Sequence, residues 1–434
     1  MIQQLLKHND YLLQEARKIA RHSSWETLER QDHVLHGQYR TKRTTYTTYI
    51  DLRHEKPAFR CTCKSRKTPC KHALALLVLL HERKAVFQEV QEFPEDLQVW
   101  LKRRDNRLNP KERTADQEAQ LAQIRQNNWE KRLAQMSKGL HDLELWLEEV
   151  VRIGLANLYE RDAAYWEAWS ATLVDAKLGS LAKRVKAIPE FFLEEHWHEA
   201  LLAELGDLYL LVKGFQNIEE LPSDLQQELF NTLGVSVKKE QVLQTAPVQD
   251  LWCVLGKHEG TEEHLSFQRT WLWGKNTQRY ALLLDYSWGG KGFAQDLPIG
   301  RVLQAEMCFY PASFPQRALL KTYQLTEQPF ETRGYTDFLA FQKAYAKALA
   351  QHPWLGVFPV ILEQVRPFFH QQQLYLSDAN DLYLACDKDL DEQTAWQIIA
   401  LSGGHPIQIF GEWKNQQFLP LGVVAENRFV DFSS

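Results

Sequence analysis

The sequence has few cysteines and no long apolar run, and each shortage excludes a class of protein. Six cysteines in 434 residues are too few for a disulfide-stabilised scaffold. No apolar stretch approaches the ~20 residues needed to cross a bilayer. The N-terminal segment MIQQLLKHNDYLLQEARKIA is typical of a polar amphipathic helix and lacks the apolar core of a signal peptide. These absences predict a cytoplasmic protein.

Common catalytic motifs are also missing. The segment GGKGF at 289–293 has neither the spacing nor the hydroxyl residue of a phosphate-binding loop, and no GxSxG or HExxH motif occurs. The acidic run at 377–392 lacks the loop glycine and final glutamate of an EF-hand, so a solvated edge, or acids that cap the following helix, is favoured over a calcium site. We therefore expect no catalysis. An enzyme within 235–434 would need shifted titratable groups that converge in a pocket.

Hydrophobic patterning predicts three kinds of structure along the chain. Strand-like segments at 33–40 and 44–54 predict a hairpin, a short strand PAFRCTC follows, and a helix is expected over 70–87. From about 114 to 215 apolar residues recur near every 3.6 positions, which indicates helices, with Gly139 as a possible break. Beyond Gly234 short aromatic and β-branched segments indicate antiparallel strands, with helices at about 336–350 and 391–401.

Three of the six cysteines cluster within ten residues and are followed by a histidine. Cys61, Cys63, Cys70 and His72 offer three sulfurs and one nitrogen, which is the closed tetrahedral donor set of a structural zinc site. Four protein ligands leave no position for an activated water, so zinc-dependent hydrolysis is not expected. The other cysteines stand alone in apolar segments and are expected to be buried apolar side chains: Cys253, Cys308 and Cys386.

The pattern CxC…CxH, with PCKHALAL around its second half, resembles the SWIM zinc finger. The order of finger, WLKRR linker, long helical segment and β-rich region is also similar to bacterial SWIM zinc finger family proteins. This resemblance implies one structural Zn²⁺, interaction with DNA or protein, and no catalytic residues. It also implies a MoxR-type ATPase and a von Willebrand A-type protein as candidate partners.

Together these patterns predict an α+β multidomain protein. The expected parts are a small zinc-finger domain (β-hairpin plus helix) with an N-terminal helix, a linker, a helical bundle, an antiparallel β-rich region and a C-terminal α+β region. Their predicted bounds are residues 1–90, 91–113, 114–233, 234–330 and 331–434.

The cluster of cysteines lies in a strongly basic stretch. Between Arg40 and His72 ten Lys and Arg stand against two acids, a net charge of +8 in a chain whose total is −5. Such a local field favours an anionic partner, although a solvated surface remains the alternative. The predicted nucleic-acid-binding residues are Arg40, Lys42, Arg43, Lys64, Arg66, Lys67 and Lys71.

Two functions fit these features equally well. The first is nucleic acid (DNA) binding, in which basic side chains contact phosphates and Tyr39, Tyr46 and Tyr49 either stack on bases or belong to the strand core. The second is a protein-interaction adaptor that docks an acidic partner. Neither function predicts a small-molecule substrate or a membrane.

Overall fold

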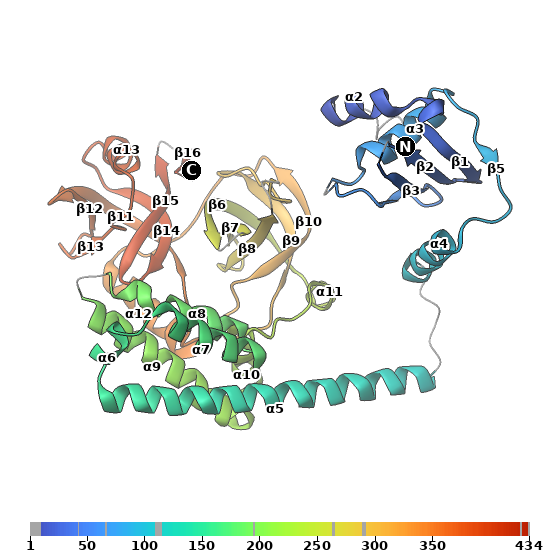
Figure 1. Cartoon of the computed structure of the whole chain (residues 1–434). Helices are drawn as coiled ribbons and strands as arrows, with labels where there is room; N and C mark the ends of the chain where they lie inside the picture. The colour runs from blue at the N-terminus through green and yellow to red at the C-terminus, as the bar shows by residue number, and fades with distance from the viewer. Residues whose placement is uncertain are drawn as a thin grey trace. The chain divides into compact units, whose positions relative to one another are not determined.

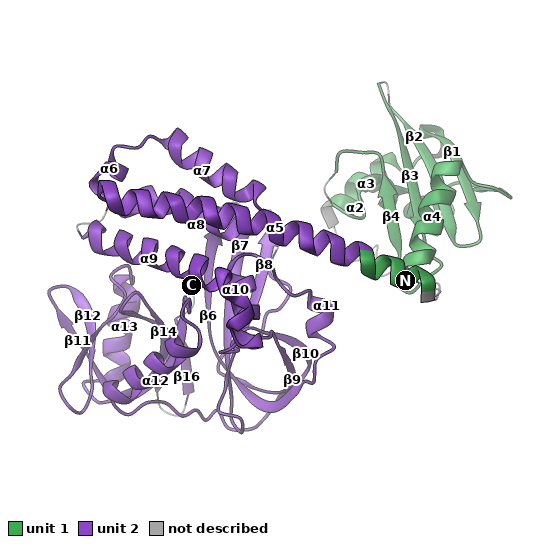
Figure 2. Cartoon of the chain, turned by 90° about the horizontal axis from the view of Figure 1, so that it is seen from below, with its two compact units in different colours: residues 1–123 green, residues 124–434 purple. Residues whose placement is uncertain are grey.

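The computed structural model describes residues 10–41, 43–65, 67–108, 115–193, 196–262, 265–288, 292–425 and 428–432. The chain forms two compact units, residues 1–123 and 124–434 (Figure 2). The predicted α+β class is confirmed, with a small sheet-and-helix domain, a helical bundle and a C-terminal β-rich region (Figure 1). Among the described residues, no helix combines the length and apolar character that a membrane span requires.

Unit 1 is built on a five-stranded sheet in the order β4-β3-β2-β1-β5. The predicted hairpin is confirmed as β2 and β3, which pair from Val34↔Asp51 to Arg40↔Thr45. Helix α3 buries its apolar residues against this sheet, and α2 packs on α3 within the same core. The elements are α2 (Asp10–Ile19), η1 (His22–Ser24), β1 (Trp25–Gln31), β2 (Val34–Arg40), β3 (Thr45–Asp51), β4 (Ala58–Cys61), α3 (Lys71–His81) and β5 (Gln88–Glu89).

A glycine allows α3 to lie close to this sheet. A Cβ built on Gly37 of β2 would lie 2.7 Å from the Leu76 side chain and 2.8 Å from the Trp25 ring. Any side chain at this position would therefore push the helix away from the strands. This close packing sets the distance between α3 and the strands.

Helix α4 (Glu95–Leu108) follows β5 and packs on the finger. The sequence predicts a linker over residues 91–113. The fully buried Leu97 instead joins a small core with Val34, Tyr49 and Phe93. Helix α4 is therefore part of the folded finger.

A bundle of helices begins unit 2. Its core is formed by apolar residues from α5, α7, α8, α9 and α10. The predicted break at Gly139 is wrong, because α5 continues through it. A Cβ at Gly139 would lie 2.3 Å from that of Ala176, so the glycine permits close helix packing. The elements are α5 (Ala115–Ile153), α6 (Ala156–Tyr159), α7 (Ala163–Asp175), α8 (Gly179–Phe191), α9 (Trp197–Gln216), η2 (Ile218–Glu220), α10 (Ser223–Thr232) and α11 (Lys239–Val242).

The first sheet of unit 2 confirms the change of pattern predicted beyond Gly234. It has the order β10-β9-β6-β7-β8, and its neighbouring strands are antiparallel. The strands are β6 (Val248–Glu262), β7 (Leu265–Gly274), β8 (Tyr280–Trp288), β9 (Val302–Phe309) and β10 (Ala318–Thr326).

The second sheet has the order β13-β12-β11-β14-β15-β16. It packs against the first through a shared core that includes Trp271, Ile361 and Phe410. The predicted acidic cap is confirmed, because the Asp391 carboxylate accepts a hydrogen bond from Thr394 N–H at 2.8 Å. The elements are α12 (Phe338–Gln351), β11 (Phe358–His370), β12 (Gln373–Ser377), β13 (Tyr383–Ala385), α13 (Glu392–Ser402), β14 (Ile407–Lys414), β15 (Gln417–Ala425) and β16 (Arg428–Asp431).

Candidate metal centre and the basic surface

The four predicted metal ligands come from the end of β4 and the start of α3. Cys61 is the last residue of β4, and Cys63 follows two residues later. Cys70 is the extended residue that precedes α3, with φ −80° and ψ 171°. Its carbonyl accepts the first helical bond from Leu74 N–H at 3.0 Å. His72 lies in the first turn and is buried. The end of β4 carries the first pair of ligands, the start of α3 carries the second pair, and the two pairs therefore lie side by side.

The spacing of the ligand atoms fits one zinc ion. All four lie within 4.8 Å of one another, and Cys61 Sγ is 3.7 Å from His72 Nδ1. A tetrahedral ion with Zn–S of about 2.3 Å and Zn–N of about 2.05 Å would separate sulfur and nitrogen by about 3.6 Å. These residues would hold a structural Zn²⁺, which would cross-link β4 to α3.

Neighbouring side chains orient two of the ligands. Thr48 of β3 is fully buried and donates its hydroxyl to Cys61 Sγ at 3.2 Å. The rings of Tyr39 and Tyr46 pack on the His72 imidazole, with centroids 5.3 and 4.7 Å away. Such second-layer contacts fix the direction of a metal ligand.

Hydrogen bonds among the ligands separate the pKa values of two thiols. The pKa of Cys61 is lowered to about 3 because its sulfur accepts hydrogen bonds from Cys70 and, more weakly, from His72 and Thr48. The hydrogen bond to Cys61 and burial raise the pKa of Cys70. The thiolate is the metal-binding form of cysteine, so the site already favours that form at Cys61.

The isolated cysteines behave as predicted. Cys253, Cys308 and Cys386 are buried in unit 2. Burial raises the pKa of the Cys253 thiol to about 11. These residues are buried apolar side chains and none belongs to the four-ligand cluster.

All five predicted nucleic-acid-binding residues that the structure describes have exposed side chains, and three of them lie on the segment that carries the ligands. Lys64 and Lys67 lie on the connection between the two ligand pairs, and Lys71 separates Cys70 from His72. We call these three lysines, with Arg43 on the β2–β3 turn, the basic surface. Arg40 is exposed but lies 2.5 Å from the Glu26 carboxylate. Lys42 and Arg66 lie outside the described residues.

The tyrosines near this surface are engaged with protein groups. Tyr49 is 3% exposed, and its hydroxyl donates to Asp96 of α4. Burial, together with that hydrogen bond, raises its pKa. Tyr39 and Tyr46 are half-buried against His72. Strand-core packing therefore accounts for these rings better than base stacking does.

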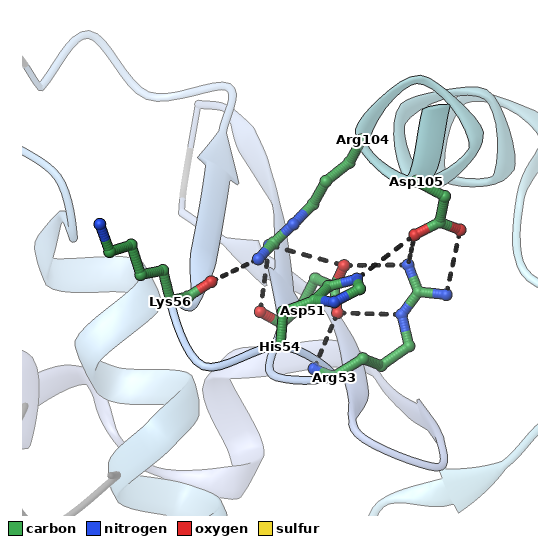
Figure 3. Close-up of polar contacts among 6 residues, drawn as sticks. All are labelled: Asp51, Arg53, His54, Lys56, Arg104 and Asp105. Carbon is green, nitrogen blue, oxygen red and sulfur yellow. Dashed lines mark hydrogen bonds and ion pairs between the residues drawn. The ribbon is translucent and has the colours of Figure 1, made fainter. Parts of the chain in front are cut away.

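A network of ion pairs joins α4 to the finger (Figure 3). Asp51 is fully buried, and Arg53 binds it at 3.0 Å and Asp105 of α4 at 2.8 Å. Arg104 of α4 is 3.5 Å from Asp51 and donates to the carbonyl oxygens of Asp51 and Lys56. Burial opposes ionisation of Asp51, but the hydrogen bonds from Arg53 prevail and lower its pKa. Arg53 is therefore an internal ion-pair partner and does not belong to the basic surface.

The same ion-pair network contains a second group of residues that could hold a metal ion. Asp51, His54 and Asp105 lie within 4.8 Å of one another. The two arginines already neutralise both carboxylates. The arrangement is that of an ion-pair network, and the cysteine cluster remains the better metal site.

Unit 2 contains a buried acid–base pair that sequence reasoning missed. His352 Nε2, just after α12, lies 3.1 Å from Glu228 Oε1 on α10. Burial raises the pKa of Glu228 to about 7 and lowers the pKa of His352 to about 4. Between these values both groups are uncharged. Neither residue stands in a recognisable motif, so only tertiary structure brings them together.

This pair predicts opposing pH effects on stability. The raised pKa of Glu228 contributes to the free energy of unfolding below pH 4.5, and this contribution is lost as the pH rises towards 7. The lowered pKa of His352 contributes to the free energy of unfolding above pH 6.5, and this contribution is lost as the pH falls towards 4. The two slopes largely offset each other in the wild type. Relative to wild type, E228Q should therefore lose stability when the pH falls from 6.5 to 4.5. H352Q should lose stability when the pH rises from 4.5 to 7. Each loss should amount to about 1–3 kcal/mol.

Urea unfolding of the three full-length proteins between pH 4.5 and 7 measures these slopes. Zinc release at low pH is common to all three, so only differences from wild type are compared. Parallel pH profiles for the two variants would contradict the assigned pKa shifts.

Comparison with family models finds two matches. Residues 46–80 match the SWIM zinc finger, a span that holds all four ligands. Residues 131–233 match the SWIM-associated four-helix bundle domain, a span that runs from within α5 to just beyond α10. No curated protein and no solved structure matches the chain.

Proposed function

We infer that this chain, which contains a SWIM zinc finger and a SWIM-associated four-helix bundle domain, is a zinc-stabilised binding protein whose finger contacts DNA. The supporting observation is the position of the basic surface. Lys64, Lys67 and Lys71 are exposed on the segment that the ligands anchor at both ends. Zinc would hold these charges in place, and a reducing compartment such as the cytoplasm keeps the ligand thiols free.

The proposed contacts are electrostatic. Lysines that neutralise phosphates give strongly salt-dependent binding with little sequence specificity. Tyr49 is buried, and Tyr39 and Tyr46 pack on His72, so no ring of this group is free to serve as a stacking platform. We therefore expect the finger to bind the DNA backbone rather than exposed bases.

Charge reversal of the basic loop tests this proposal. The variant K64E/R66E/K67E should abolish micromolar DNA binding, and the wild-type affinity should fall steeply between 50 and 200 mM salt, as is typical of several phosphate contacts. Gel retardation and fluorescence anisotropy with a labelled duplex measure both effects.

A matched control places the same charge change elsewhere. The variant K186E/K239E/K321E reverses three exposed lysines of unit 2 and should leave DNA binding within about threefold of wild type, because none of the three belongs to the basic surface. Salt-independent binding, or equal loss in both variants, would refute the DNA-binding function.

A protein-interaction adaptor is the second candidate. The helices of unit 2 expose large apolar side chains, among them Leu145 and Val151 of α5 and Leu202 of α9, at 52, 70 and 56%. Such side chains favour a protein partner, and the resemblance of the chain suggests a MoxR-type ATPase or a von Willebrand A-type protein. Recovery of either one from nuclease-treated extract would favour the adaptor. Neither candidate includes a catalytic step.

A further inference from the structure

A cavity of about 510 Å³ lies between the two sheets of unit 2. It is formed by the β7–β8 turn, the connection from β9 to β10, the segment before α12 and the start of β11. Five aromatic rings line it: Trp273, Tyr280, Phe314, Tyr335 and Phe358. This size and lining are typical of small-molecule sites, which often lie where two substructures meet.

The cavity is positively charged. Arg279 and Arg333 line it, and no acidic residue does. Neither guanidinium pairs with a carboxylate from the part of the chain that the structure describes, although twenty-one other ion pairs form there. Glu363, which lies near this wall, is not a lining residue, and its carboxylate accepts hydrogen bonds from Gly334 N–H and the Gln408 amide.

Arg279 is held in place without a counter-charge. Its guanidinium carbon lies 4.1 Å from the centroid of the Phe309 ring, a cation–π contact that stabilises the position of the group. Burial lowers its pKa, and no carboxylate opposes that effect. A part-buried arginine without an acidic partner is stabilised by a bound anion, which it can contact through two parallel N–H groups.

Two neutral groups add further hydrogen-bond donors. Gln316 lines the cavity, and its buried Nε2 has no hydrogen-bond partner among the described residues. The Tyr280 hydroxyl oxygen accepts a hydrogen bond from Ile361 N–H at 3.1 Å, which leaves its own proton to donate. An orphaned buried donor is costly unless a ligand or water satisfies it.

We propose that this cavity binds a small organic anion, whose carboxylate or phosphate contacts Arg279 and Arg333 and whose planar apolar body lies between the aromatic rings. Both arginines donate to oxygen, and the rings supply the apolar contact area. The site belongs to unit 2 and involves neither the zinc ligands nor the basic surface. It is therefore independent of the proposed DNA binding.

The fluorescent aromatic sulfonate 1-anilinonaphthalene-8-sulfonate is a suitable probe for the full-length protein. We expect this probe to bind the folded wild-type protein. Phenyl phosphate and benzoate should displace the probe at concentrations at least about tenfold lower than those needed for neutral benzyl alcohol. The reason is that only the anions can form charge-assisted hydrogen bonds with the arginines. The ratio between phenyl phosphate and benzoate shows which anionic group the site prefers.

The variant R279A/R333A should bind the probe at least about tenfold more weakly and lose the preference for anions. The control R301A/R366A removes two arginines that do not line the cavity and should keep both properties. DNA retardation should be unchanged in both variants. Equal displacement by benzyl alcohol, or unaltered binding in R279A/R333A, would overturn the proposal. Thermal unfolding checks the fold of the double variant, and R333A, which alters an exposed side chain, should show the same loss in weaker form.

Discussion

Serine at Cys61 or Cys70 is expected to release zinc and unfold the finger while unit 2 stays folded. Both sulfurs belong to the only four-ligand cluster found among the described residues. Binding of structural zinc supplies about 10–16 kcal/mol in small zinc domains, which is comparable with the whole stability of an ordinary domain. Loss of one ligand therefore removes the interaction that holds β4 to α3.

Unfolding should extend from residues 30–90 into α4. The helix is attached to the finger through Asp51, Asp105 and Tyr49, and these partners separate when the sheet unfolds. Hydrogen exchange should show loss of protection in residues 30–108 and native protection in residues 124–434.

Metal analysis and hydrogen exchange on the full-length protein test this result. Wild type should contain about one zinc per chain, as expected for a closed four-ligand site, and C61S much less. The variant C386A alters a buried cysteine of unit 2 and should keep its zinc, even if unit 2 loses stability. A zinc content near one in C61S, or none in wild type, would contradict the assignment of the four ligands.

Alanine at Asp51 should destabilise unit 1 by about 3–5 kcal/mol, the usual effect of removing one partner from a buried ion pair. The carboxylate is fully buried and neutralises Arg53 and Arg104, whose side chains are 32 and 12% exposed. Because the pKa of Asp51 lies below its usual 3.8, this contribution is present at neutral pH and disappears only as pH falls through the folded-state value.

Hydrogen exchange of the unit 1 amides in the full-length protein measures this loss of stability. The control E26A removes an exposed ion pair with Arg40, whose side chain is 70% exposed, and should cost less than about 1 kcal/mol. Equal effects of D51A and E26A would show that the network adds little to the stability of the finger.

The ligand set and most elements could be predicted from local pattern. The CxC…CxH spacing identified Cys61, Cys63, Cys70 and His72, because metal coordination requires particular atoms within a short stretch of chain. Apolar periodicity likewise indicated the hairpin, the helical bundle and the strands of unit 2. Strand β1 was missed because WETLERQ has mostly polar residues, and its pairing with β2 determines its conformation.

Residue charges were harder to interpret than residue spacing. Arg53 and Arg60 contributed to the basic count, yet Arg53 binds Asp51 and Arg60 lies 5.9 Å over the Tyr49 ring. A charge contributes to an external surface only if no partner elsewhere in the chain neutralises it. Such partners, like Asp105 of α4, are distant in sequence and invisible to local patterns.

The sequence alone determined the zinc ligands, since four donors in twelve residues can meet without help from distant segments. The tertiary structure decided which groups surround them. It attached α4 to the finger through Asp51, paired Glu228 with His352, and placed Arg279 and Arg333 in one cavity without an acid. Each of these arrangements depends on contacts between segments far apart in the chain, and burial and electrostatics act only once those contacts form.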